Sequence, residues 1–242
     1  MAAYQSRARN NVDQEIMNKT EYYRNPKTAE TYDNVRYTGS SGKYVLQKEM
    51  GRISQFLSGV KTILDLPAGT GKAHKWLSSG DRQVIGVDSS FPMLKCAQAY
   101  ENKRTIADAS MLPFPDNSFD CVVMLRFLFH FAEPECFIKE AARVLKKDGI
   151  LIFETYTWSL LFRDFYIPKF LGGRNYCHSK VEIINMIDKL KLNLQATQSD
   201  FIFSPTCYRF FPIWFHKTLE MIERLLPESI RVSKLWILKK AS

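Results

Sequence analysis

The sequence predicts an α/β protein built on a doubly wound, mostly parallel sheet, and three observations lead to that fold class. Short apolar strands alternate with helical patterns between residues 61 and 156. Each strand–helix–strand repeat implies a crossover to a parallel neighbour, which is the unit of a doubly wound sheet. The chain has 242 residues, enough to bury one large core, so we expect a single domain.

Five strands are expected in this central part, at residues 62–66, 84–88, 104–106, 119–124 and 150–153. One helix is expected to begin near Pro92, and another to begin at Pro134 and end at Gly149. Ligands of such sheets bind at the carboxyl ends of the strands. The functional residues are therefore expected at that edge of the sheet.

Helical patterns precede this central part, and a mixed pattern follows it. Residues 14–32 predict a helix interrupted at Pro26, and residues 42–57 an amphipathic helix. After residue 156 the pattern predicts two helices and two further strands, at 180–190, 215–226, 195–203 and 233–239. These bring the sheet to seven strands.

We therefore expect one domain over residues 1–242 with three parts. Residues 1–58 form an N-terminal helical cap, and residues 59–156 form the ligand-binding core. Residues 157–242 hold a C-terminal helical and aromatic insertion and the last strands. The aromatic residues of this last part, among them Trp158 and Phe162, suggest an apolar substrate chamber or lid.

The composition limits the class of protein. The start of the chain lacks the apolar core of a secretory signal, and no run of about 18 apolar residues occurs, so we expect a soluble, cytoplasmic protein. Five cysteines are scattered without a close pair, so neither a disulfide framework nor a metal site is expected. The net charge of +9 is compatible with a nucleic acid or an anionic membrane surface without choosing between them.

The most informative segment runs from Ile63 to Gly71, where an apolar strand enters a turn of small residues and then a helix. Glycines in such a turn let backbone amides approach a ligand closely. A dinucleotide fingerprint would need Gly or Ala at position 74, where His74 stands. A phosphate loop would need Gly at position 66 and Ser or Thr at 73, where the chain has Leu66 and Ala73. Both of these nucleotide-binding motifs are therefore disfavoured.

The same residues, Asp65-Leu66-Pro67-Ala68-Gly69-Thr70-Gly71, resemble the cofactor-binding signature of class I methyltransferases, which use S-adenosylmethionine (SAM). Pro67 departs from that pattern by taking a place often held by glycine. It removes one amide donor and stiffens the turn. The resemblance continues at Asp88, which ends the second strand and resembles the acidic residue that binds the cofactor ribose.

Two later blocks extend the resemblance to residues 61–156. Asp108-Ala109 resembles the pair that meets the adenine, and Leu125 and Arg126 follow the fourth strand, where the family places the methionine moiety. Upstream, Tyr32-Asp33 resembles the Tyr-Asp pair of the branch that contains the ubiquinone and menaquinone biosynthesis methyltransferases. The cofactor-binding residues implied by the resemblance are Asp65, Pro67, Ala68, Gly69, Thr70, Gly71, Asp88, Ser89, Met93, Asp108, Ala109, Leu125, Arg126 and Tyr32.

The catalytic residue is left open by the sequence. His130 follows the fourth strand, and an imidazole that titrates near neutral pH is suited to act as a general base, although a packing role fits it as well. Glu154 and Tyr156 come just after the expected fifth strand, on the side where substrate should enter. These three residues are the candidates.

The resemblance implies methyl transfer from SAM, leaving S-adenosylhomocysteine (SAH), to a small-molecule acceptor by direct in-line displacement and without a metal. The aromatic C-terminal half favours an apolar, aromatic or lipid-like acceptor, and the basic residues there favour an anionic acceptor or peripheral membrane contact. Nucleic acid is not expected as the acceptor, and the oligomeric state is undetermined. The alternatives are a catalytically silent partner subunit, an RNA methyltransferase and a dehydrogenase.

Overall fold

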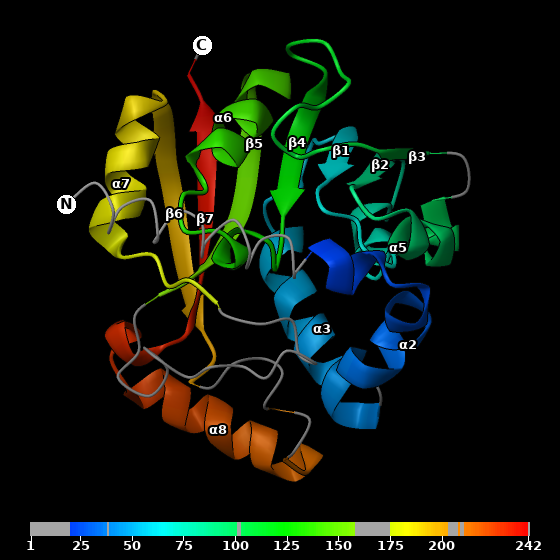
Figure 1. The fold of residues 1–242 in the computed structure, drawn as a ribbon. Coiled ribbons are helices and arrows are strands. Elements are labelled where there is room, and N and C mark those ends of the chain that lie inside the picture. The colour runs from blue at the N-terminus through cyan, green and yellow to red at the C-terminus, as the bar shows by residue number, and fades with distance from the viewer. Residues whose placement is uncertain are drawn as a thin grey trace, which may run out of the picture.

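The structure is a computed structural model that describes residues 20–37, 39–100, 103–157, 175–202, 208 and 211–241. Within these residues seven strands form one sheet in the order β3-β2-β1-β4-β5-β7-β6 (Figure 1). The strands are β1 (Thr62–Asp65), β2 (Gln83–Asp88), β3 (Arg104–Ile106), β4 (Phe119–Met124), β5 (Leu145–Tyr156), β6 (Leu192–Asp200) and β7 (Ser233–Lys240). The predicted fold class, a mostly parallel seven-stranded sheet, is confirmed.

Strand pairing places the ligand-binding edge. β1 pairs in parallel with β2 on one side and with β4 on the other, and β3 and β5 continue the parallel part. β7 is antiparallel to both β5 and β6. Because the chain winds away from β1 in both directions, the carboxyl ends of β1 and β4 form the topological switch point where such sheets bind ligands.

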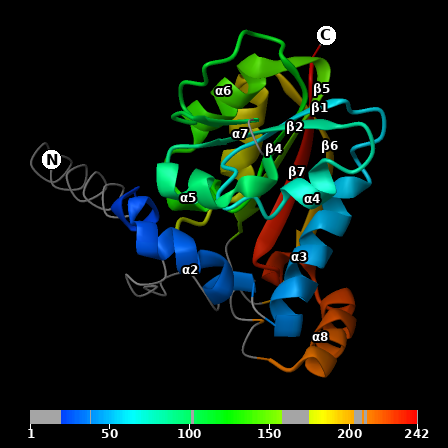
Figure 2. The ribbon, with the colours of Figure 1, turned by 90° about the vertical axis from the view of Figure 1, so that its right-hand side faces the viewer.

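Helices cover both faces of the sheet. One face carries α3 (Gly39–Ser54), α4 (His74–Leu77) and α5 (Phe91–Cys96), and the other carries α6 (Glu135–Val144) and α7 (Lys180–Lys189). Figure 2 shows α3 and α4 on the opposite side of the sheet from α6 and α7. An apolar core lies on each face of the sheet, and neighbouring residues of β1 point into different cores. Ile63 belongs to the core that contains Met50 of α3, whereas Leu64 belongs to the core that contains Ile138 of α6.

The N-terminal cap consists of residues 20–24, α2 (Pro26–Tyr37) and α3. Asn25 begins α2 by accepting hydrogen bonds from the amides of Lys27 and Thr28, and Pro26 stands at the first helical position. The predicted interruption at Pro26 is therefore the start of a new helix, which continues five residues beyond the predicted end. Residues 14–19 of the predicted helix lie outside the described residues.

Two short 3₁₀ helices flank the ligand-binding edge, η1 (Gln98–Tyr100) and η2 (Leu128–His130), and a third, η5 (Glu228–Ile230), precedes β7. The remaining helix, α8 (Ile213–Leu225), lies at the same end of the molecule as α2 (Figures 1 and 2). The arrow of β4 points toward this end in Figure 1. Among the described helices, none is long and apolar enough to cross a membrane.

Several predicted boundaries are wrong, among them those of the helix after Pro134 and of strand β6. The helix after Pro134 ends at Val144, not at Gly149, because Leu145 takes an extended conformation and pairs with Phe119 of β4. Gly149 therefore lies inside β5, where a Cβ atom would meet the Asp120 carbonyl oxygen at 3.0 Å. Strand β6 begins and ends three residues earlier than predicted, and the backbone of Phe201 turns away with a φ of 60°.

Candidate functional site

Two adjoining cavities lie at the carboxyl ends of β1, β2 and β4. The smaller has a volume of about 150 Å³ and is lined by residues of the cap, the glycine turn and the segment after β4. The larger, of about 820 Å³, extends toward β3 and α6. The residues that line both are Thr20, Pro67, Asp88, Ser89, Phe127 and Phe131.

The glycine turn forms the floor of the smaller cavity. Pro67, Ala68, Gly69 and Thr70 line it. The amide of Ala68 donates to the Val87 carbonyl oxygen at 2.8 Å, which ties the turn to β2. Gly69 has a φ of 53°, in the left-handed region that glycine enters without steric cost.

Gly71 is outside the lining of both cavities. Its φ is 80°, and a Cβ atom there would meet the ring of Tyr100 at 3.1 Å. Its role in the structure is therefore to let the turn pass close to η1. It supports the site through the backbone and does not face the cavity.

Asp88 stands between the two cavities at the end of β2. One carboxylate oxygen accepts a hydrogen bond from the Gly69 amide and the other from the Ser90 amide, both at 2.9 Å. Burial raises the pKa of Asp88, and the amides of Ser90 and Gly69 oppose that rise. The two amides hold the carboxylate in place, so its remaining lone pairs can accept bonds from a ligand.

Asp65 ends β1 beneath the smaller cavity. Its carboxylate is buried and accepts a hydrogen bond from the hydroxyl of Tyr100. Burial raises the pKa of Asp65 to about 7, although the Tyr100 hydrogen bond works in the opposite direction. The proton of this carboxyl is therefore easily gained or lost near neutral pH.

The larger cavity contains the other predicted acidic residue. Asp108 and Ala109 line it, as do Glu133 and Phe137. One oxygen of the Asp108 carboxylate accepts from both the amide and the hydroxyl of Ser110 at 2.7 Å. The second oxygen has no hydrogen bond to a described residue, which leaves it able to accept from a ligand.

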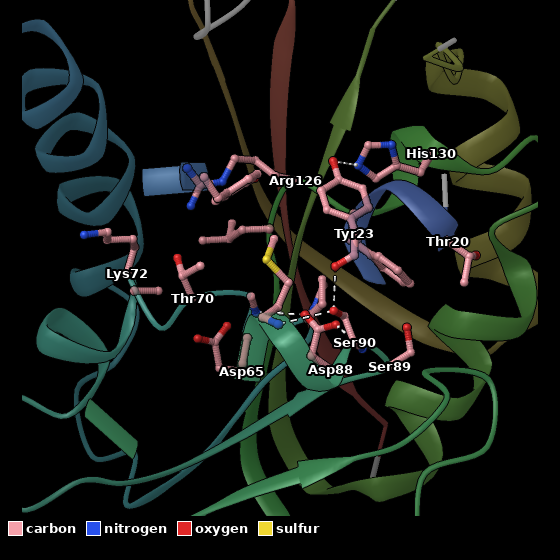
Figure 3. A pocket seen from close by; sticks show the side chains of 18 of the residues that line it. Thr20, Tyr23, Asp65, Thr70, Lys72, Asp88, Ser89, Ser90, Arg126 and His130 are labelled. Atoms are coloured by element: carbon pink, nitrogen blue, oxygen red, sulfur yellow. Dashed lines mark hydrogen bonds between the residues drawn. The ribbon is translucent and has the colours of Figure 1, made fainter. Parts of the chain in front are cut away.

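Aromatic side chains from the cap line the smaller cavity. The rings of Tyr23 and Tyr32 lie 6.1 Å apart, and those of Tyr32 and Tyr37 lie 6.4 Å apart. The hydroxyl of Tyr23 faces Nε2 of His130 at 3.4 Å (Figure 3). Burial raises the pKa of the Tyr23 phenol, so Tyr23 is neutral and can donate to that imidazole.

Of the fourteen predicted cofactor residues, eleven line the smaller cavity or both cavities, and Asp108 and Ala109 line the larger one. Only Gly71 lines neither. The eleven include Tyr32, Ser89, Met93, Leu125 and Arg126. Tyr23 and Tyr37 also line the smaller cavity but were not predicted from the sequence, because they reach the site only through the packing of the cap.

The three catalytic candidates are placed differently. His130 lines the smaller cavity. Glu154 is buried and accepts from the Arg126 amide at 3.2 Å and from the Ser233 hydroxyl, and it lines neither cavity. Tyr156 also lines neither, and its ring stacks on Phe129 at 4.1 Å.

The described aromatic residues of the C-terminal half lie away from the cavities. Phe201 and Tyr208 pack with Val45 of α3 and Leu219 of α8 in a separate apolar cluster. Trp158 and Phe162 lie outside the described residues. Several of the basic residues there are paired, since Lys239 meets Asp148 at 3.0 Å.

Among the described residues there is no group of three or more His, Cys, Asp or Glu side chains arranged to hold a metal ion.

Comparison with known proteins identifies the family. Residues 64–153 match the family model described as a methyltransferase domain. An uncharacterized protein of Methanocaldococcus jannaschii is 33% identical over 150 residues, which cover 57% of this chain and 68% of that protein. The ubiquinone/menaquinone biosynthesis C-methyltransferase of Pseudomonas fluorescens is 36% identical over 138 residues. These cover 51% of this chain and 53% of that enzyme, so the chain spans about half the length of this relative.

Solved structures show the same fold. The magnesium protoporphyrin IX methyltransferase of Synechocystis, solved with bound SAH, has a TM-score of 0.63 at 17% identity and covers 93% of this chain and 100% of its own. A geranyl diphosphate methyltransferase, solved with GPP and sinefungin, has a TM-score of 0.61 at 13% identity, with coverages of 81% and 78%. The matched domain and relatives show that the chain belongs to the class I SAM-dependent methyltransferases, in the branch of the ubiquinone and menaquinone biosynthesis enzymes, and the fold agrees with this.

Proposed function

We propose that this protein transfers the methyl group of SAM to a small acceptor molecule with an aromatic, apolar or lipid-like part. The observation that carries the proposal is the position of Asp88, which lines both of two adjoining cavities of different size. A ligand that spans both would present its ribose to this carboxylate. A nucleoside with an extended polar arm has that shape.

The residues around the two cavities fit SAM. We propose that Asp88 accepts hydrogen bonds from the ribose hydroxyls, and that Asp108 and Ala109 meet the adenine in the larger cavity. Asp65, the turn from Pro67 to Thr70, and Leu125 would hold the methionine moiety in the smaller one. The open space in front of Gly69, where an added Cβ would meet no atom within 4 Å, supports a close approach of the cofactor.

SAM supplies a methyl group already activated on a sulfonium, so the work of the protein is alignment and exclusion of water. Tyr23, Tyr32 and Tyr37 close the smaller cavity over the place where the acceptor would lie. Alignment of this kind contributes about 7–11 kcal/mol in favourable cases. Of the three catalytic candidates His130 lines the cavity, and we propose that it holds or accepts the acceptor's proton while Tyr23 orients its ring.

The lining of the smaller cavity supports the acceptor class. Tyr32, Tyr37, Phe127 and Phe131 present rings to it, and aromatic rings bind other planar or apolar groups well. The matched relatives named for quinone biosynthesis also support an aromatic acceptor with an apolar part. The aromatic surface thus comes from the cap and from the segment after β4.

We further propose that α8 contacts an anionic membrane surface, which would suit a lipid-like acceptor. Trp214 and Leu225 on this helix are 69% and 80% exposed, and Met221 is 60% exposed. Lys217 and Arg224 are exposed beside them. A helix that offers apolar and basic side chains together is suited to lie in a membrane interface.

The cofactor proposal is tested by ligand-dependent stability. SAM and SAH should each raise the melting temperature, whereas NAD and ATP should not, because a ligand that binds only the folded state stabilises it by about 2.7 kcal/mol at one hundred times its Kd. Asp88→Asn should weaken SAH binding about ten-fold or more, since it removes a charged acceptor of hydrogen bonds. Calorimetric titration with SAH measures this directly.

Asp81→Asn is the control, because Asp81 is exposed and lines neither cavity. Its SAH affinity should equal that of the unmodified protein. Stabilisation by NAD without any by SAM or SAH would contradict the proposal and favour a dehydrogenase. SAH binding without methylation of any phenol, quinone or lipid pool would favour a silent partner subunit.

A further inference from the structure

Arg126 has an unusual backbone at the edge of the smaller cavity. It follows β4 by two residues and has a φ of 52°, a left-handed conformation that non-glycine residues adopt at a cost of about 1–3 kcal/mol. Its amide donates to the buried carboxylate of Glu154 at 3.2 Å, which holds this conformation. Such strain persists where the surrounding structure enforces it, and it is concentrated at ligand sites.

The guanidinium of Arg126 is held by one of its nitrogens. Nη1 donates to the hydroxyl of Tyr37 and lies 3.3 Å from a carboxylate oxygen of Glu49, and the guanidinium lies over the Tyr37 ring at 5.0 Å. Neither Nε nor Nη2 forms a hydrogen bond to a described residue. These two nitrogens form one edge, or fork, of the guanidinium. Through this edge an arginine can donate two parallel hydrogen bonds to a carboxylate or a phosphate.

Glu49 does not neutralise this charge well. Both of its carboxyl oxygens are buried without a hydrogen-bond partner. Burial and the neighbouring Glu154 hold the pKa of Glu49 well above its usual range, with Arg52 opposing them. By contrast Lys72, in the wall of the same cavity, is paired with Asp33 at 3.0 Å.

We infer that Arg126 determines acceptor specificity by binding an anionic group of the methyl acceptor, a carboxylate or a phosphate, through its Nε–Nη2 edge. The inference rests on the proposed function, because it places the acceptor in the smaller cavity beside His130 and the cap tyrosines (Figure 3). Tyr37 keeps the guanidinium in position, and the buried Glu154 holds the backbone of Arg126. The aromatic part of the acceptor then lies among the surrounding rings.

The experiment measures binding to the SAH-saturated protein by calorimetric titration. The probes are benzoate and phenyl phosphate, with benzyl alcohol as the neutral probe of similar shape. Arg126→Gln should lower the affinity for both anions about ten-fold or more, because a hydrogen-bonded charge is lost. It should leave benzyl alcohol unchanged. Arg126→Lys should restore only part of the affinity, since an ammonium lacks the planar fork.

Two further variants test whether anion binding depends on Arg126 itself or on the other charges near the cavity. Glu49→Gln keeps the shape of the buried partner, and because Glu49 does not neutralise the guanidinium well, this change should alter the anion affinities little. Lys72→Gln removes the other cation of the wall and should change the anion affinities by less than about two-fold, because its ion pair is exposed to solvent. Each variant is compared at a matched degree of folding by circular dichroism.

SAH affinity distinguishes the possible failures. If the unmodified protein does not bind SAH, the proposed function fails before this inference is reached. If Arg126→Gln weakens SAH binding as much as anion binding, the fork holds the cofactor's carboxylate and the inference is wrong. It is also wrong if benzoate binds no better than benzyl alcohol, if neither anion binds, or if Lys72→Gln causes an equal loss.

Discussion

At the scale of single residues, Asp65 shows how one buried carboxyl couples the site to pH. Its pKa is about 7 in the folded protein because burial disfavours the charged form. In the unfolded chain the ordinary value of 3.8 applies. Between these two values the folded state binds more protons than the unfolded state, so this group makes stability fall as the pH rises.

The Asp65→Asn variant isolates that contribution. The free energy of unfolding of the unmodified protein, minus that of the variant, should fall by up to about 1.4 kcal/mol per pH unit between pH 4 and pH 7, and stay level above pH 7. Urea unfolding of both proteins across this range measures the difference. Parallel pH profiles would show that Asp65 titrates normally.

Tyr100→Phe provides a second check on the same residue. The Tyr100 hydroxyl donates to the charged carboxylate and so lowers its pKa. Without the hydroxyl, the pKa of Asp65 should rise, and the fall in stability should continue above pH 7. If the fall in stability still ended at pH 7 in this variant, the hydrogen bond would contribute little to the pKa of Asp65.

At the scale of elements, the corner between α2 and α3 decides whether the cap tyrosines reach the cavity. A Cβ atom on Gly42 would lie 2.4–2.6 Å from the backbone of Tyr37, so the two helices can meet this closely only at glycine. Tyr37 ends α2 and lines the smaller cavity. The position of the aromatic wall therefore depends on a residue that is outside the site.

Gly42→Ala should destabilise the protein by about 1–3 kcal/mol, as overpacking commonly does. It should also weaken SAH binding by displacing α2. Gly51→Ala, in the same helix, is the matched control, because nothing lies within 4 Å of an added Cβ there. That change should stabilise α3 by about 0.5–1 kcal/mol. Thermal unfolding and SAH titration are measured for both variants. Equal changes in stability and SAH affinity in the two variants would contradict the role given to Gly42.

At the scale of the whole molecule, the proposed membrane contact depends on both the net charge of +9 and the exposed apolar face of α8. The protein should sediment with phosphatidylglycerol vesicles and much less with phosphatidylcholine vesicles. Replacing both Trp214 and Leu225 by Ser should reduce the partition about ten-fold or more, because each loses buried apolar area worth about 1.5–3 kcal/mol. Val181→Ser, an exposed apolar residue on α7, is the control. Unchanged sedimentation of the double variant would rule out α8 as the contact.

Local sequence patterns were enough to predict the alternation of strands and helices, the glycine turn after β1 and the acidic residues that end β1 and β2. These features are local, because a run of apolar residues, a turn glycine or a carboxylate after a strand has its meaning within a few positions. The seven strands were found in this way. The boundary at Gly149 was missed because Leu145 is held extended by its pairing with Phe119, a contact across the sheet.

The cap residues of the smaller cavity could not be predicted from the sequence, because packing brings them there. Tyr23 and Tyr37 are distant in sequence from Arg126, and neither their spacing nor their residue types indicates that the cap places them at the end of β4. Glu154 follows the same rule, because its burial beside Ser233 depends on the antiparallel pairing of β5 with β7. The propensity to form a helix, strand or turn depends on neighbouring residues. The shape and charge of a pocket depend on side chains that packing brings together from separate elements.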